Sequence, residues 1–193
     1  AILAALTLVL GACGFGGGDE KSEDSKSEGK SLNLSIASEP PSLHPQLATD
    51  TQSGSILNGV FEGLTRVDDK GNVENAMAED VKVSDDKLTY TFTLRDDAKW
   101  SNGDQVTAGD FEYAWKWALE PKNAAQYSYI FYAIKGAEAY NMGKGKAEDV
   151  GVKATDDKTL EVTLNNPTPY FLELTAFYSY MPINKKVAEK NDK

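Results

Sequence analysis

The sequence contains very few residues of the kinds that bind metals or form disulfides. Among its 193 residues there are one cysteine and one histidine. A lone cysteine cannot close a disulfide within the chain, and a dedicated zinc site takes roughly four ligands, mostly cysteine and histidine. A disulfide framework and a dedicated zinc site are therefore excluded, and catalysis by a cysteine–histidine pair is disfavoured. We expect no metal and no cofactor.

Positive charge is also in short supply. The chain carries 20 basic and 30 acidic residues, and its formal net charge is -10. A surface that follows the phosphates of a nucleic acid needs the opposite sign, so no nucleic acid is expected as a partner. Hydrophobic residues nevertheless make up 40% of the chain and aromatic residues 10%. This composition is typical of a globular protein with a core of ordinary size.

The common catalytic motifs are missing as well. No serine lies in a nucleophile-elbow pattern, and no glycine-rich loop ends in the Lys-Ser or Lys-Thr pair of a phosphate-binding loop. Pairs of aspartates occur only in turn contexts, where aspartate caps the backbone. These pairs are Asp68-Asp69, Asp85-Asp86, Asp96-Asp97 and Asp156-Asp157. His44 precedes a proline and has no companion ligand, so we interpret it as a plain surface histidine. We expect the chain not to be an enzyme.

The N-terminus has the pattern of a targeting segment. Residues 1–12, AILAALTLVLGA, carry no charge and match the apolar part of a secretory signal peptide whose basic beginning is missing. The run is too short to span a bilayer, which takes about 20 residues. Leu10, Gly11, Ala12 and Cys13 resemble the lipobox of bacterial lipoproteins, which predicts that Cys13 carries a lipid. The alternative is a buried free cysteine. Residues 13–31 are mostly glycine, serine and charged residues and are predicted to form a flexible tether.

Beyond the tether, alternating hydrophobic patterns predict strands. Leu32, Leu34 and Ile36 alternate with polar residues, as in a half-buried strand. Residues 81–94 and residues 152–164 each contain two alternating runs around an aspartate pair, which is the pattern of a β-hairpin. We therefore expect two antiparallel hairpins.

Helical spacing occurs in three stretches. Residues 53–64 place their large apolar side chains on one face. Thr107 and Asp110 form a capping-box pattern at the start of a helix that Pro121 ends. The buried face of that helix is expected to hold Phe111, Ala114, Trp115 and Ala118. A further helix is expected over residues 134–142. The fold class is accordingly α/β, mixed α and β with antiparallel hairpins.

Several stretches beyond the tether resemble a known family. They include SEPPSLHPQLATD, VFEGLTRVDDKGNV, KWSNGDQVTAGDF and NNPTPYFLELTAF, and the likeness runs from Leu32 to the end of the chain. These stretches resemble the oligopeptide-binding lipoproteins of bacterial peptide ABC importers, which are extracytoplasmic solute-binding proteins of family 5. Members of that family are much longer, with two lobes that close over a peptide and a smaller extra domain. The resemblance therefore implies a partial chain of the class II periplasmic-binding-protein-like fold.

The resemblance also implies how the chain is divided. Residues 1–12 are expected to be the truncated signal peptide, 13–31 the lipidated cysteine and its tether, 32–61 the start of the first lobe, 62–184 the small extra domain, and 185–193 the start of the return to the first lobe.

As to function, the resemblance implies a monomeric binding protein that captures oligopeptides and delivers them to the permease subunits of an ABC transporter for import. A lipid anchor would hold it at the extracytoplasmic face of the cell membrane. One alternative is a peptide-sensing or adhesive surface lipoprotein of the same fold. Another is a variant that binds a dipeptide, a nickel complex or haem. A secreted hydrolase is disfavoured because no nucleophile and base are present.

Matching the family residue by residue implies four ligand-binding positions in this chain. Thr49, Asp50 and Thr51 fall where the family contacts the ligand backbone, and Tyr127 matches a tyrosine that faces the ligand. The family often has glutamate at the position of Thr49 and glycine at that of Asp50, so the main chain is the safer candidate there. For Tyr127 the alternative is a core tyrosine.

Overall fold

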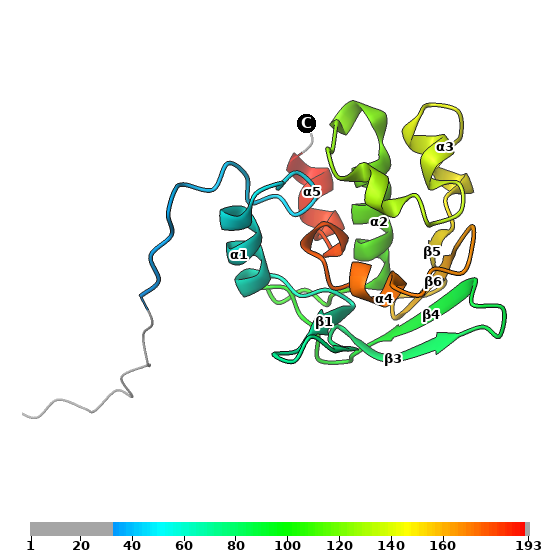
Figure 1. Ribbon diagram of the computed structural model, residues 1–193, viewed down its shortest axis with the longest axis horizontal. Coiled ribbons are helices and arrows are strands. Elements are labelled where there is room, and N and C mark those ends of the chain that lie inside the picture. The colour runs from blue at the N-terminus through cyan, green and yellow to red at the C-terminus, as the bar shows by residue number, and fades with distance from the viewer. Residues whose placement is uncertain (1–32, 192–193) are drawn as a thin grey trace, which may run out of the picture. The chain divides into compact units, whose positions relative to one another are not determined.

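The computed structural model describes residues 33–191 (Figure 1). The predicted signal peptide, Cys13 and the predicted tether lie outside the described residues. The chain divides into two units, Ala1–Ser35 and Ile36–Lys193, and the helices and strands between residues 33 and 191 all belong to the second. No helix in that range has the length and apolar character needed to cross a membrane.

The main sheet has four antiparallel strands in the order β3-β4-β6-β5. Its strands are β3 (Ala78–Val83), β4 (Thr89–Leu94), β5 (Val152–Ala154) and β6 (Thr159–Thr163). Both predicted hairpins are confirmed. They are joined by the pairing of β4 with β6, which runs from Thr89 opposite Thr163 to Thr93 opposite Thr159. Alternate residues of β4 are buried, as the period of a strand with one face in the core requires.

A smaller sheet pairs β1 (Thr65–Val67) with β2 (Val73–Asn75). The turn between them contains Gly71 with φ +85, a conformation that glycine adopts without a Cβ clash. The Asp68 carboxylate accepts hydrogen bonds from the backbone N–H groups of Lys70 and Asn72, both at 2.8 Å. The aspartate in this turn therefore caps the backbone, as the sequence predicted.

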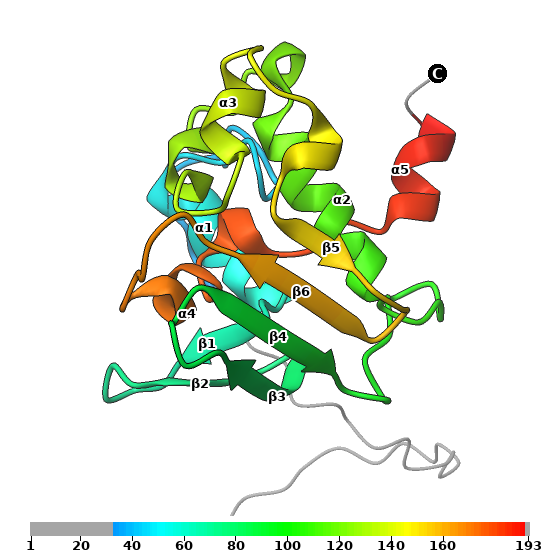
Figure 2. The ribbon, with the colours of Figure 1, turned by 90° about the vertical axis from the view of Figure 1, so that its right-hand side faces the viewer.

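Helix α2 (Ala108–Leu119) packs against β5 and β6 and forms the centre of the helical layer on one face of the sheet (Figures 1 and 2). Its predicted capping box is present, with the Asp110 carboxylate accepting from the Thr107 N–H at 2.9 Å. The four residues expected on its buried face, Phe111, Ala114, Trp115 and Ala118, are all at most 1% exposed. The capping and the apolar face together account for the position of this helix.

The remaining helices are short. They are α1 (Thr51–Val60), α3 (Ala137–Asn141), α4 (Phe171–Leu174) and α5 (Lys185–Asn191), with 3-10 turns η1 (Pro121–Asn123), η2 (Ser128–Phe131), η3 (Ala147–Asp149) and η4 (Tyr178–Tyr180). The helix predicted over 53–64 begins earlier because Asp50 caps it, and it ends at Val60. The helix predicted over 134–142 is shorter because Gly136, with φ +73, precedes its first residue.

The predicted strand at Leu32, Leu34 and Ile36 is wrong for the residues that the structure describes. Residues 33–36 have no regular secondary structure, and the side chains of Leu34 and Ile36 are 80% and 43% exposed. Alternation of apolar and polar residues supplies one face of a strand but not the neighbouring backbone that must accept its hydrogen bonds. No such neighbour pairs with this segment among residues 33–191.

Candidate functional site

Asp50 ends the loop before α1 and caps that helix. Its carboxylate accepts hydrogen bonds from the hydroxyl of Ser53 at 2.6 Å and from the backbone N–H of Ser53 at 2.9 Å. The hydroxyl and then the backbone N–H of Ser53 hold the pKa of the Asp50 carboxyl below its usual value. Because the carboxylate serves as the cap, the Asp50 side chain is committed to the helix rather than to a ligand.

The backbone on either side of Asp50 presents an acceptor and a donor. Asp50 is extended, with φ -125 and ψ 161, so the C=O of Thr49 and the N–H of Thr51 point to the same side. Thr51 is the first residue of α1, where the N–H has no acceptor within the helix. No hydrogen bond from this N–H occurs within residues 33–191. Such a pair can bind the N–H and C=O of one residue in an extended peptide, as in parallel strands.

Tyr127 reaches this segment from a distant part of the chain. Its hydroxyl donates a hydrogen bond to the carbonyl oxygen of Thr49 at 3.2 Å, across 78 positions. A carbonyl oxygen can accept two hydrogen bonds, so Thr49 keeps one acceptor position. The ring of Tyr127 is half-buried and lies 6.1 Å from the ring of Tyr129 and 6.0 Å from that of Phe177. Tyr127 is therefore at the rim of the core rather than inside it.

Four of the five predicted site residues thus meet at one place. Thr49, Asp50, Thr51 and Tyr127 together are called the Thr49–Tyr127 wall. The fifth, Cys13, lies outside the described residues.

Tyr178 belongs to the same neighbourhood, although the sequence did not single it out. It is 8% exposed and packs in a small apolar cluster with Ala48, Leu57 and Met181. Burial first, and then the neighbouring Tyr127 hydroxyl and the charge of Asp50, raise the pKa of Tyr178 to about 12. The only signal in the sequence is its place in the aromatic run FYSY, which does not distinguish it from its neighbours.

His44 differs from its prediction as a plain surface histidine. It is half-buried, and its ring centre lies 4.3 Å from that of Trp117 on α2. The residues that follow, Pro45 and Gln46, are buried. His44 therefore packs against an aromatic ring, which is a structural role.

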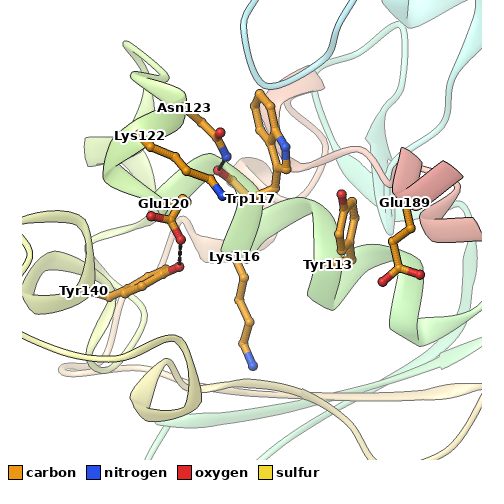
Figure 3. Close-up of a pocket in the computed structure, with 8 residues that line it drawn as sticks. All are labelled: Tyr113, Lys116, Trp117, Glu120, Lys122, Asn123, Tyr140 and Glu189. Carbon is orange, nitrogen blue, oxygen red and sulfur yellow. Dashed lines mark hydrogen bonds between the residues drawn. The ribbon is translucent and has the colours of Figure 1, made fainter. Parts of the chain in front are cut away.

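A cavity of about 600 Å³ lies elsewhere, beside α2 (Figure 3). Lys116, Glu120 and Lys122 from one side and Glu189 from α5 give it mixed charge. The Glu120 carboxylate already accepts a hydrogen bond from the Tyr140 hydroxyl at 2.6 Å, and none of the predicted site residues lines the cavity. The Thr49–Tyr127 wall is the better candidate because it offers an open backbone donor.

No ligand set for a metal ion is assembled in the part of the chain that the structure describes. Within residues 33–191, no three histidine, cysteine, aspartate or glutamate side chains are grouped closely enough to hold one.

Comparisons of sequence agree with one another on the family. Residues 72–193 match the family model described as bacterial extracellular solute-binding proteins, family 5 Middle. The oligopeptide-binding protein OppA of Bacillus subtilis is 61% identical over 100% of this chain, and the dipeptide-binding protein DppE of the same organism is 50% identical over 91%. The chain spans 36% and 33% of these two proteins, about a third of their length.

Solved structures lead to the same family. The structure of Listeria monocytogenes OppA bound to peptide is 48% identical, with a TM-score of 0.80, covering 84% of this chain and 32% of that chain. An oligopeptide ABC transporter substrate-binding domain from Bacillus anthracis is 49% identical, with a TM-score of 0.80, covering 82% of this chain and 31% of that chain.

Proposed function

The chain belongs to the bacterial extracellular solute-binding proteins of family 5, and from this membership we propose that it forms part of a protein that captures oligopeptides and delivers them to an ABC permease for import. The observation that carries the proposal is the pair of backbone groups on either side of Asp50. The C=O of Thr49 and the N–H of Thr51 point to one side, and the N–H has no partner within residues 33–191.

Backbone pairing of this kind explains how one protein accepts many peptide sequences. The N–H and C=O of a ligand residue are the same whatever its side chain, so the hydrogen bonds they make contribute to affinity without selecting a sequence. Each such bond contributes about 0.5–1.5 kcal/mol net. Tyr127 lies beside the same carbonyl and combines an apolar ring with a hydroxyl, which suits a partly wet wall.

The relatives support a peptide as the ligand. The Bacillus subtilis relative is named an oligopeptide-binding protein, and the Listeria monocytogenes structure is of a protein bound to peptide. Because this chain covers about a third of those proteins, we assign it one wall of the site and not the whole site. In the transport cycle its part is to bind the peptide, with no catalytic step.

The place of action follows from the N-terminal pattern. A lipid on Cys13 would hold the protein at the extracytoplasmic face of the cell membrane, with residues 14–31 as the tether. There a monomer would meet both peptides from outside and the permease subunits within the membrane. The support for the anchor is the sequence Leu10-Gly11-Ala12-Cys13 after an uncharged run.

Two measurements test the proposal. Calorimetric titration of the full-length protein with several peptides of unrelated sequence should give similar dissociation constants, because backbone groups dominate. Binding of dipeptides only, or of no peptide, would contradict an oligopeptide ligand. Deletion of the gene should then abolish growth on peptides as the sole source of amino acids. Normal growth would favour a sensing or adhesive role over import.

A further inference from the structure

One short turn contacts both parts of the Thr49–Tyr127 wall, which are the segment Thr49–Thr51 and the side chain of Tyr127. It consists of η4 and the residue that caps it, Met181, and is called the Tyr178–Met181 turn. Gln46, which is 1% exposed, donates hydrogen bonds from its side-chain amide to the C=O groups of Ser179 at 3.0 Å and Met181 at 2.8 Å. The loop that leads into Thr49 is therefore hydrogen-bonded to this turn.

The ring of Tyr178, which belongs to the same turn, packs against the first half of α1. A Cβ placed on Gly54 would lie 3.0 Å from Cε1 of Tyr178, so the absence of a side chain at Gly54 lets the ring lie against the helix. The hydroxyl of Tyr178 interacts with that of Tyr127, and the charge of Asp50 also acts on it. Tyr178 thus connects the helix cap on one side with Tyr127 on the other.

Tyr127, the second part of the wall, is connected to the turn through Tyr180. The Tyr180 hydroxyl donates to the carbonyl oxygen of Ile130 at 2.8 Å, and the N–H of Ile130 donates to the carbonyl oxygen of Tyr127 at 3.1 Å. The turn is itself held by α2, because the indole N–H of Trp115 donates to the carbonyl oxygen of Tyr180 at 2.7 Å. All three bonds join backbone carbonyls to fixed donors in or beside the core.

We propose that the Tyr178–Met181 turn sets the position of Thr49 and Thr51 relative to Tyr127, with Gln46 and Tyr178 as the positioning residues. This inference rests on the proposed function. Neither residue touches the ligand: both are buried behind the wall, at 1% and 8% exposed. They act through the loop and the helix cap, so their loss weakens peptides of every sequence alike.

The test is Gln46→Met in the full-length protein, measured by calorimetric titration with several peptides of unrelated sequence. Methionine keeps the length of the side chain and removes both donors. We expect the dissociation constant to rise about tenfold for each peptide. The matched control is Gln105→Met, since the Gln105 amide also donates to two carbonyls, those of Asp96 at 3.1 Å and Ala98 at 2.7 Å. These lie in the loop before α2, and the control should change binding by less than about twofold.

A double-mutant cycle with Tyr127→Phe separates positioning from general support of the fold. If Gln46 acts by placing the loop against Tyr127, the effect of Gln46→Met shrinks to less than about twofold in the Tyr127→Phe background. A full tenfold effect in that background, or equal losses in Gln46→Met and Gln105→Met, overturns the inference.

Tyr178→Phe provides a second variant in case Gln46→Met does not fold. It retains the ring against Gly54, removes the hydroxyl, and should raise the dissociation constants about threefold. Tyr132→Phe, which removes a hydroxyl bonded to Asn141 at 2.7 Å, is its control and should leave them unchanged. Unchanged binding by Tyr178→Phe contradicts the inference alone. A wild-type protein that binds no peptide contradicts the proposed function and the inference together.

Discussion

The hydroxyl of Tyr127 donates a hydrogen bond to the backbone carbonyl of Thr49, 78 positions earlier in the chain, at 3.2 Å. This bond joins a 3-10 turn in the middle of the chain to the residue that precedes the cap of α1. It places an aromatic ring beside an extended backbone segment in which the N–H of Thr51 donates no hydrogen bond within residues 33–191. This segment, the domain that supports it and the proposed lipid anchor on Cys13 each lead to an expected outcome that can be measured.

Proline at position 51 should weaken binding of all peptides, whereas alanine should not. Thr51 is the first residue of α1 and follows an extended residue, so proline fits the backbone. It removes an N–H that donates no hydrogen bond within residues 33–191, and alanine controls for the loss of the side chain. We expect Thr51→Pro to weaken binding by roughly 1 to 3 kcal/mol in calorimetric titrations of the full-length protein. If Thr51→Ala weakens binding as much as Thr51→Pro, the side chain rather than the backbone recognises the ligand.

Removal of the Asp110 carboxylate should destabilise the domain strongly. The group is 6% exposed and accepts from the Thr107 N–H at 2.9 Å, the Trp100 indole N–H at 3.1 Å and the Lys185 N–H at 2.9 Å. Asp110→Ala leaves these three donors and the Thr107 hydroxyl, which donates at 3.2 Å, without this acceptor. The free energy of unfolding in urea should therefore fall by about 2–4 kcal/mol.

The matched control for Asp110 is Asp149→Ala in η3. The Asp149 carboxylate accepts from the Lys146 N–H at 3.1 Å, but the group is exposed. It should change the free energy of unfolding by less than about 1 kcal/mol. Equal losses of unfolding free energy in the two variants would show that burial of the Asp110 carboxylate does not increase its contribution to stability.

Alkaline pH should destabilise the domain through two tyrosines, the half-buried Tyr140 and the buried Tyr178. Burial and the Glu120 carboxylate raise the pKa of Tyr140 to about 12, and burial with Tyr127 and Asp50 does the same for Tyr178. Below the ordinary value of 10.0 both states keep their protons, so the contribution to stability is present in full. Above it the unfolded chain ionises first, and stability falls as pH rises towards 12.

Urea unfolding of the wild-type protein and of Tyr140→Phe between pH 8 and pH 11.5 measures this effect. The variant should lose stability less steeply than the wild type above about pH 10, and the two slopes should coincide between pH 8 and pH 9. Parallel slopes across the whole range would assign the alkaline loss to other groups.

The elements that local pattern specifies were predicted from the sequence, and those that depend on distant partners were not. Both hairpins and the capping box of Thr107 and Asp110 are confirmed because each is decided within a few residues. The strand around Leu34 failed because no local signal supplies its neighbour. The resemblance to family 5 and the mixed fold are confirmed by the comparisons.

The candidate site shows the same division. The cap that Asp50 forms is local, but the pattern predicted that the helix begins at residue 53 and did not identify Asp50 as its cap. The approach of Tyr127 to Thr49 spans 78 positions and was accessible only through the family resemblance. Tyr178 and Gln46 were not found at all, because a tyrosine in an aromatic run and a glutamine in a loop give no periodic or motif signal. Their importance depends on what the fold brings against them.

If Cys13 carries a lipid, binding of the protein to the membrane should depend on the sulfur atom of this residue. Cys13→Ser removes the atom that would carry the lipid, so the protein should be released into the medium or remain as an uncleaved precursor. Membrane fractionation and the mass of the N-terminal peptide measure both outcomes. A processed Cys13→Ser protein that stays with the membrane would contradict anchoring through this residue, since acyl chains are what make such binding stable.

The most direct test of the central claim is a crystal structure of the full-length protein with a bound oligopeptide. The account predicts a peptide carbonyl oxygen about 2.7–3.2 Å from the backbone nitrogen of Thr51, a peptide N–H directed at the carbonyl of Thr49, and the ring of Tyr127 in contact with the ligand. A peptide bound elsewhere, with the Thr51 N–H still open and Tyr127 out of reach, would contradict it.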